Sequence, residues 1–136
     1  MIKVIAGKKG SGKTKRLIDM TNETAATAEG VVVFLDDDNR YIFDVDRKVR
    51  FVNAGEYHVH TPDMFLGFLS GMLSQNYDIT TVFVDSFSKL AKTDIQSAGA
   101  IFDVMEELSS KHDVDFICSV SEDIASLPEA VAKYVI

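Results

Sequence analysis

The stretch Gly7-Lys8-Lys9-Gly10-Ser11-Gly12-Lys13-Thr14 follows directly after the apolar run Ile2–Ala6. The run is rich in β-branched residues and predicts a buried strand, and a helix is predicted from Lys13 to about Ala28. The glycines between them allow the backbone to curl, so that successive N–H groups point into one concavity. An anion held there would also lie on the first turn of the helix, where N–H groups lack partners. The stretch therefore predicts a strand, an anion-binding loop and a helix.

Three further apolar runs, 31–35, 80–84 and 116–120, predict buried strands. The segments between them have helical periodicity, including a helix that starts at Thr61-Pro62 and one through Ala98–Leu108. Continuous apolar strands that alternate with helices are typical of a parallel sheet covered on both faces. We therefore expect a three-layer α/β/α fold with a mostly parallel central sheet.

Two segments fit this alternation less clearly. Residues 41–54 predict a hairpin or a short strand, and Tyr134–Ile136 an additional edge strand. The chain contains no internal repeat, low-complexity segment or linker, so residues 1–136 are expected to form a single domain.

Positive charge is concentrated at the start of an acidic chain. The formal net charge is −7, but residues 1–20 carry six basic residues and one acidic residue, a balance of +5 that leaves −12 for the rest. This distribution suits a compact anion better than an extended nucleic acid, so strong nucleic-acid binding is not expected. No apolar run is long enough to span a membrane, and the single cysteine, Cys118, cannot form an intramolecular disulfide. Both observations favour a cytoplasmic protein.

The glycine-rich stretch matches the Walker A pattern, with Gly7 and Gly12 at the two required places. In such a loop the backbone of all eight residues cradles phosphates, and Lys13 reaches the β- and γ-phosphates. Thr14 offers its hydroxyl to Mg²⁺. The expected ligand is therefore a nucleoside triphosphate with magnesium.

A second motif lies further along the chain, in Val82-Phe83-Val84-Asp85. Apolar residues that end in an aspartate have the form of a Walker B strand, whose carboxylate holds Mg²⁺ through water. Ligands of open parallel sheets bind beyond the carboxyl ends of the strands. Three of the predicted strands end at that edge in Gly7, Asp36 and Asp85, so a site is expected there.

These two motifs, in this order, resemble the P-loop NTPases of the RecA-like (ASCE) group, over nearly the whole chain except residues 40–60. The chain is also similar to small, stand-alone bacterial P-loop ATP-binding proteins, some labelled as pilus-retraction ATPases. The resemblance implies an ATPase fold in which the strand at 116–120 lies between the Walker A and Walker B strands. It also implies that Ser119 senses the γ-phosphate and that Asp36 or Asp37 orients the attacking water.

Two features separate the chain from many such enzymes. Ser86 stands directly after Asp85, where many relatives have a glutamate, so slow ATP hydrolysis is expected. A nucleotide-binding regulatory module that does not hydrolyse is the first alternative. A small-molecule kinase is the second, because Asp38-Asn39-Arg40-Tyr41 is distantly similar to type II thymidine kinases, although their glutamate and cysteine-bound zinc are missing. ATP is favoured over GTP because Asp85-Ser86-Phe87-Ser88 lacks the Asp-x-x-Gly of G proteins.

Proteins of the RecA-like group often complete their site with a basic residue from a neighbouring subunit. The resemblance therefore allows for a homo-oligomer or a protein partner that completes the site. The candidate basic residues are Arg47, Lys48, Arg50, Lys89 and Lys92.

Overall fold

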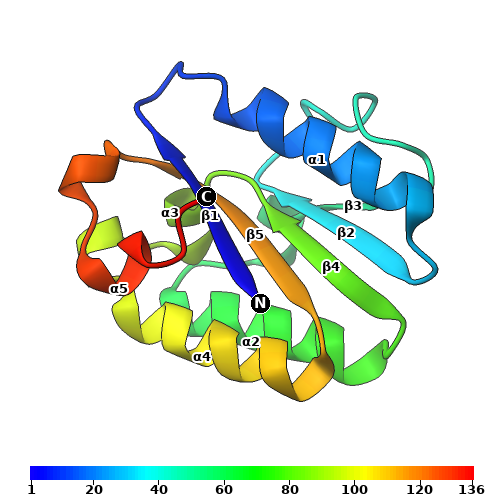
Figure 1. The fold of residues 1–136 in the computed structure, drawn as a ribbon. Coiled ribbons are helices and arrows are strands. Elements are labelled where there is room, and N and C mark those ends of the chain that lie inside the picture. The colour runs from blue at the N-terminus through cyan, green and yellow to red at the C-terminus, as the bar shows by residue number, and fades with distance from the viewer.

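The computed structural model describes residues 1–136. They form one sheet of five parallel strands, together with helices (Figure 1). Along the sheet the strands follow the order β1-β5-β4-β2-β3. Their bounds are β1 Ile2–Gly7, β2 Val31–Asp36, β3 Arg50–Asn53, β4 Ile79–Val84 and β5 Asp115–Ser121.

Helices cover both faces of the sheet, so the expected three-layer α/β/α fold with a parallel sheet is confirmed. The α1 helix lies over one face, and α2 and α4 lie over the opposite face (Figure 1). Two shorter helices, α3 and α5, lie beside the sheet. The helices are α1 Lys13–Thr27, α2 Pro62–Gln75, α3 Phe87–Ala91, α4 Gly99–His112 and α5 Glu129–Ala132. None of these helices has the combination of length and apolarity that crossing a bilayer requires.

The strand order determines which residues meet at the carboxyl edge of the sheet. The β5 strand lies between β1 and β4, the place that the resemblance to RecA-like proteins implied. Gly7 is in register with Ser121, and Asp85 and Asp36 follow at the ends of the next two strands. Four chain segments that are distant in sequence therefore end side by side.

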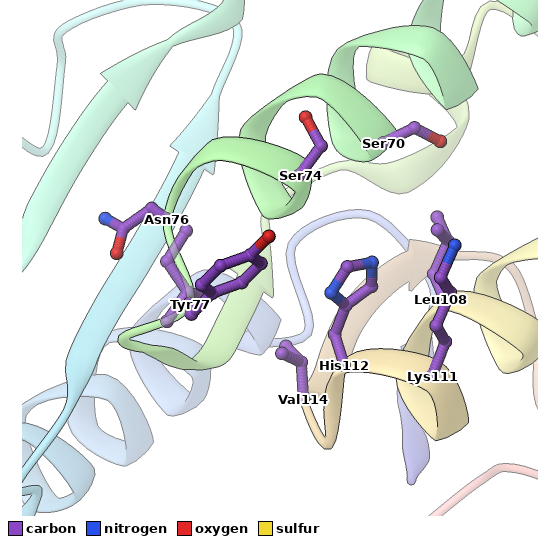
Figure 2. A pocket seen from close by; sticks show the side chains of 9 residues that line it. Ser70, Ser74, Asn76, Tyr77, Leu108, Lys111, His112 and Val114 are labelled. Carbon is purple, nitrogen blue, oxygen red and sulfur yellow. The ribbon is translucent and has the colours of Figure 1, made fainter.

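At the amino-terminal edge the structure has a groove of about 560 Å³ (Figure 2). Its walls are the C-terminal halves of α2 and α4 and the starts of β4 and β5. Lys111 is the only lining residue with a full charge at neutral pH, and no residue of the predicted site lies there. The lining side chains are Ser70, Ser74, Asn76, Tyr77, Ile79, Leu108, Lys111, His112 and Val114.

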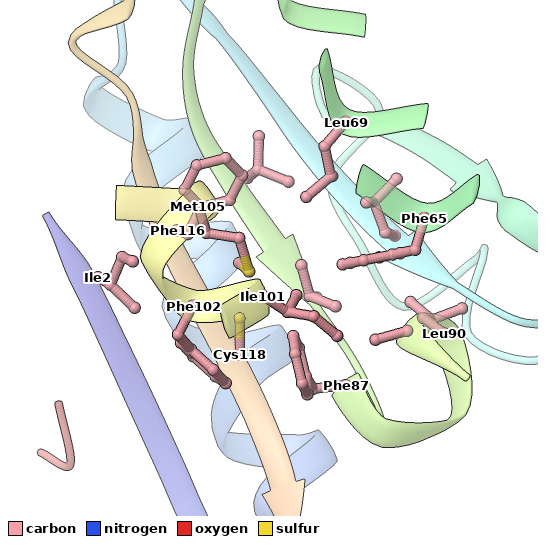
Figure 3. Close-up of a cluster of buried hydrophobic side chains, with 14 of the residues drawn as sticks. Ile2, Phe65, Leu69, Phe87, Leu90, Ile101, Phe102, Met105, Phe116 and Cys118 are labelled. Atoms are coloured by element: carbon pink, nitrogen blue, oxygen red, sulfur yellow. The ribbon is translucent and has the colours of Figure 1, made fainter. Parts of the chain in front are cut away.

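The larger hydrophobic core lies between the sheet and the helices α2, α3 and α4 (Figure 3). Phe87 of α3 packs against Phe102 of α4 at a ring-centroid distance of 4.7 Å and against Phe65 of α2 at 5.9 Å. All three rings are fully buried, and each contributes about 1.5–3 kcal/mol by leaving water. This cluster anchors the short helix α3 directly after β4.

The smaller core lies on the α1 face and includes part of residues 41–54. Those residues contain the short strand β3, and the alternative prediction of a hairpin is wrong because β3 pairs with β2 in parallel. Parallel neighbours need a crossover, and the segment 37–49 provides it. Val45 and Val49 of this segment are buried with Leu17 and Ile18 of α1. At the other edge, Val135 forms a single bridge to Val4 rather than a full strand.

Candidate functional site

The loop between β1 and α1 favours glycine at two positions by its backbone conformation. Gly10 and Gly12 both have φ of +85°, a backbone conformation that side chains with a Cβ atom disfavour. A Cβ atom on Gly7 would lie 2.6 Å from Oγ of Ser11, so a larger residue there would require the Ser11 hydroxyl to rotate away. Gly12 also directly precedes α1, which therefore starts with N–H groups that no side chain caps.

Lys13, the first residue of α1, is folded back across this loop. Its Nζ donates a hydrogen bond of 2.9 Å to the carbonyl oxygen of Lys8 and lies 3.5 Å from Oγ of Ser11. The side chain is 9% exposed. Burial lowers the pKa of Lys13, and the negative charge of Asp85 partly offsets that effect. A neutral carbonyl is a weaker partner for an ammonium group than a phosphate oxygen, so an arriving phosphate can replace it.

A second group of polar side chains surrounds Asp85, which is 2% exposed. The hydroxyl of Thr14 donates to its carboxylate at 3.2 Å, and the hydroxyl of Ser119 donates at 2.8 Å. The N–H of Ser86 in turn donates to Oγ of Ser119 at 2.7 Å. The start of α1 and the ends of β4 and β5 thus meet at one carboxylate.

Asp85 takes part in none of the four ion pairs in the structure, so its close partners are the hydroxyls of Thr14 and Ser119. Carboxylate and hydroxyl oxygens are the ligands that a hard cation prefers. Thr14 and Asp85, the predicted metal ligands, therefore lie together and have the chemistry that Mg²⁺ requires.

A cleft of about 600 Å³ opens over both groups, a size within the range of small-molecule sites. Its lining carries five cationic side chains and one carboxylate, a local balance of +4 on a chain of net charge −7. Such a lining favours a compact polyanion. The lining residues are Lys9, Gly10, Gly12, Lys13, Thr14, Lys15, Arg40, Tyr41, Asp85, Ser86, Ser88, Lys89, Ser119 and Ser121.

Most of the predicted binding residues lie in this lining, whereas the predicted water-orienting residues do not. Gly7, Lys8 and Ser11 belong to the loop but do not line the cleft. Asp36 and Asp37 lie outside the lining as well, so their predicted role has no direct geometric support.

The carboxylates of Asp36, Asp37 and Asp38 form an acidic cluster beside the cleft. Asp36 is completely buried; its Oδ1 accepts a hydrogen bond of 2.8 Å from the N–H of Asp37, and its Oδ2 has no partner. Asp37 pairs with Lys89 at 3.7 Å, and Asp38 pairs with Arg40 at 3.5 Å. Two basic residues that line the cleft, Lys89 and Arg40, are therefore each paired with an aspartate outside the lining.

Seven lining residues lie outside the predicted site: Lys15, Arg40, Tyr41, Ser86, Ser88, Lys89 and Ser121. Lys89, one of the five basic residues considered as candidates to complete the site of a neighbouring subunit, lines the cleft of its own chain, in the helix α3 that follows β4. Ser86 directly precedes that helix and has φ of +57°. The sequence signal for Arg40 and Tyr41 was the run Asp38–Tyr41, whose position depends on a loop that periodicity does not define.

Asp36 provides a test of this geometry through its titration. Burial raises the pKa of Asp36 to about 7, and the charges of Asp85 and Asp38 act in the same direction against the hydrogen bond from Asp37. Because the folded-state pKa lies above the unfolded value, protonated Asp36 stabilises the fold at low pH. That stability is lost as the pH rises from about 4 through 7.

We therefore expect Asp36→Asn to stabilise the protein at pH 8 by up to about 4 kcal/mol, at ~1.4 kcal/mol per pKa unit, and much less at pH 4.5. Denaturant unfolding at the two pH values measures the difference. The exposed Asp44→Asn is the matched control and should show little pH dependence. An equal effect of Asp36→Asn at both pH values would show that Asp36 is not protonated in the folded protein.

Comparison with models of known protein families gives no match to this chain, and no curated protein matches it significantly. The function is therefore inferred from the geometry of the cleft.

Proposed function

We propose that the cleft binds a nucleoside triphosphate, ATP, together with Mg²⁺, and that the chain is a slow ATPase of the RecA-like P-loop type. The observation that carries this proposal is the contact of 3.2 Å between Thr14 and Asp85, which are 71 positions apart in the chain. It brings two oxygen ligands for a cation to the end of a glycine-rich loop, beside the uncapped start of α1, where N–H groups suit phosphates.

Each part of the site has a distinct task in this proposal. The backbone N–H groups of the loop and of the uncapped start of α1 hold the phosphates, and Lys13 exchanges the carbonyl of Lys8 for a phosphate oxygen. Thr14 and Asp85 hold Mg²⁺, and Ser119 keeps the Asp85 carboxylate oriented through its hydrogen bond. The bound ion would neutralise charge on the β- and γ-phosphates.

Slow turnover is supported by the lack of a second carboxylate in the cleft. Asp85 is the only acidic lining residue, and Ser86 has no group that could accept a proton at neutral pH. Asp37 is the better candidate to orient water, because its partner Lys89 lines the cleft while Asp36 is completely buried. The lack of a second carboxylate in the cleft also favours the second candidate function, a nucleotide-binding regulatory module that does not hydrolyse ATP.

The proposal extends to the surroundings of the site. The buried cysteine and the acidic composition are consistent with a cytoplasmic protein that does not bind nucleic acid strongly. A second copy of the chain or a protein partner could contribute groups that accelerate hydrolysis.

Nucleotide binding is expected to depend on Lys13. At ~100 times its dissociation constant, Mg·ATP adds about 2.7 kcal/mol of stability, which for a domain of this size raises the Tm by roughly 8–14 °C. Differential scanning fluorimetry should show this shift in the wild type. It should also show it in Lys133→Ala, which changes an exposed lysine near the C-terminus. The shift should be absent in Lys13→Ala. No shift of the wild type at millimolar Mg·ATP would refute the proposed function.

The isolated, dilute chain is expected to hydrolyse ATP at well under about one per second, below the usual range of enzymes. If Asp37 orients the water, Asp37→Asn should abolish the residual phosphate release without weakening ATP binding. Asp44→Asn again serves as control. Fast turnover by the dilute chain would reveal a complete catalytic site. A residual rate unchanged in both Asp37→Asn and Asp36→Asn would favour the non-hydrolysing module.

A further inference from the structure

Arg40 is the only arginine among the residues that line the cleft. Its guanidinium group pairs with Asp38 at 3.5 Å and lies 5.0 Å from the centre of the Tyr41 ring. The side chain is 59% exposed, so it can reorient without disturbing the core. No step assigned to the cleft so far uses this cation.

The segment that carries Arg40 is anchored to the body of the protein. Val45 and Val49 are buried against α1. Asn22 of α1 donates to the carbonyl oxygen of Asp44 at 3.0 Å and accepts from the N–H of Asp46 at 2.8 Å. The segment therefore presents Arg40 at a defined rim of the cleft.

The strand order indicates which part of a bound triphosphate lies near that rim. Arg40 follows β2, which neighbours β4 and is separated from β1 by both β4 and β5. It therefore enters the cleft from the side of Asp85 and Lys89. A triphosphate whose inner phosphates lie in the loop after β1 would direct its terminal phosphoryl group toward the Thr14–Asp85 pair, and thus toward Arg40.

We infer that Arg40 binds the terminal phosphoryl group of a triphosphate held by its own chain, exchanging Asp38 for phosphate oxygens. This inference rests on the proposed function. An exposed ion pair such as Arg40–Asp38 contributes little stability, whereas a guanidinium group can donate two parallel hydrogen bonds to a phosphate. The chain would then supply its own arginine, a group that RecA-like proteins often take from a neighbouring subunit.

The consequence is a preference for ATP over ADP. Calorimetric titration of Mg·ATP and Mg·ADP should show that Arg40→Ala weakens ATP binding by about tenfold, the effect of one charge-assisted hydrogen bond, and ADP binding by no more than about twofold. Arg40→Lys retains the charge without the fork and should fall between the two. Arg16→Ala is the matched control: Arg16 is exposed, lies in the first turn of α1 and does not line the cleft. It should affect both nucleotides equally.

Three results would overturn the inference while leaving the proposed function intact, provided that the wild type binds Mg·ATP. One is an unchanged ATP-to-ADP ratio in both Arg40→Ala and Arg40→Lys. Another is a fall in the ratio of ATP affinity to ADP affinity in Arg16→Ala that equals the fall in Arg40→Ala. The third is a loss of ATP affinity in Asp38→Asn as large as in Arg40→Ala, because the ion pair itself would then matter rather than a contact with phosphate. Failure of the wild type to bind Mg·ATP would refute the proposed function instead.

Discussion

The buried carboxylate of Asp85 is the constraint on which the rest of the site depends. It ends the central part of the sheet at 2% exposure and is held by the hydroxyls of Thr14 and Ser119 rather than by a cation. Burying a carboxylate is unfavourable unless hydrogen bonds or an opposite charge compensate it, and here two hydroxyls donate to it. The Phe87 cluster fixes the chain directly after Asp85, and β5 brings Ser119 to its other side. The architecture therefore holds a carboxylate and a hydroxyl, the kind of oxygen groups that a divalent cation prefers, at the end of the glycine-rich loop.

The charge of the cleft is opposite in sign to the net charge of the chain. The chain is acidic, yet the cleft lining has a balance of +4. Lys89 and Arg40 are each paired with an aspartate behind the cleft, and Lys13 is paired with a carbonyl group. These partners hold the basic side chains near the cleft, and the carbonyl partner of Lys13 is weaker than a charged oxygen. The lining therefore combines a positive balance with partners for three of its basic side chains.

The sequence predicts the layered fold and the centre of the site because both depend on local patterns. The apolar runs and helical periods give the sheet and its covering helices. The spacing Gly7 to Thr14 gives the loop, since glycine adopts the positive φ of Gly10 and Gly12 most readily. The order of the strands then brings Asp85 and Ser119 to Thr14. What could not be predicted depends on tertiary packing. The crossover 37–49 has no hydrophobic period of its own. Its course is set by the burial of its residues Val45 and Val49 and by its hydrogen bonds to Asn22 of α1. Likewise, α3 is five residues long, too short for a periodic signal, so the sequence did not indicate that Lys89 lines the cleft of its own chain.

The most direct test of the central claim is the magnesium dependence of ATP binding in the wild type and in Asp85→Asn. The substitution retains the size of the side chain and removes its charge. Calorimetric titrations with Mg²⁺ and with a chelator should show that the ion strengthens ATP binding to the wild type, and that this gain disappears in Asp85→Asn while metal-free ADP binding is nearly unchanged. Equal losses with and without the metal would contradict the account, because Asp85 would then be a structural residue and not a ligand of the ion.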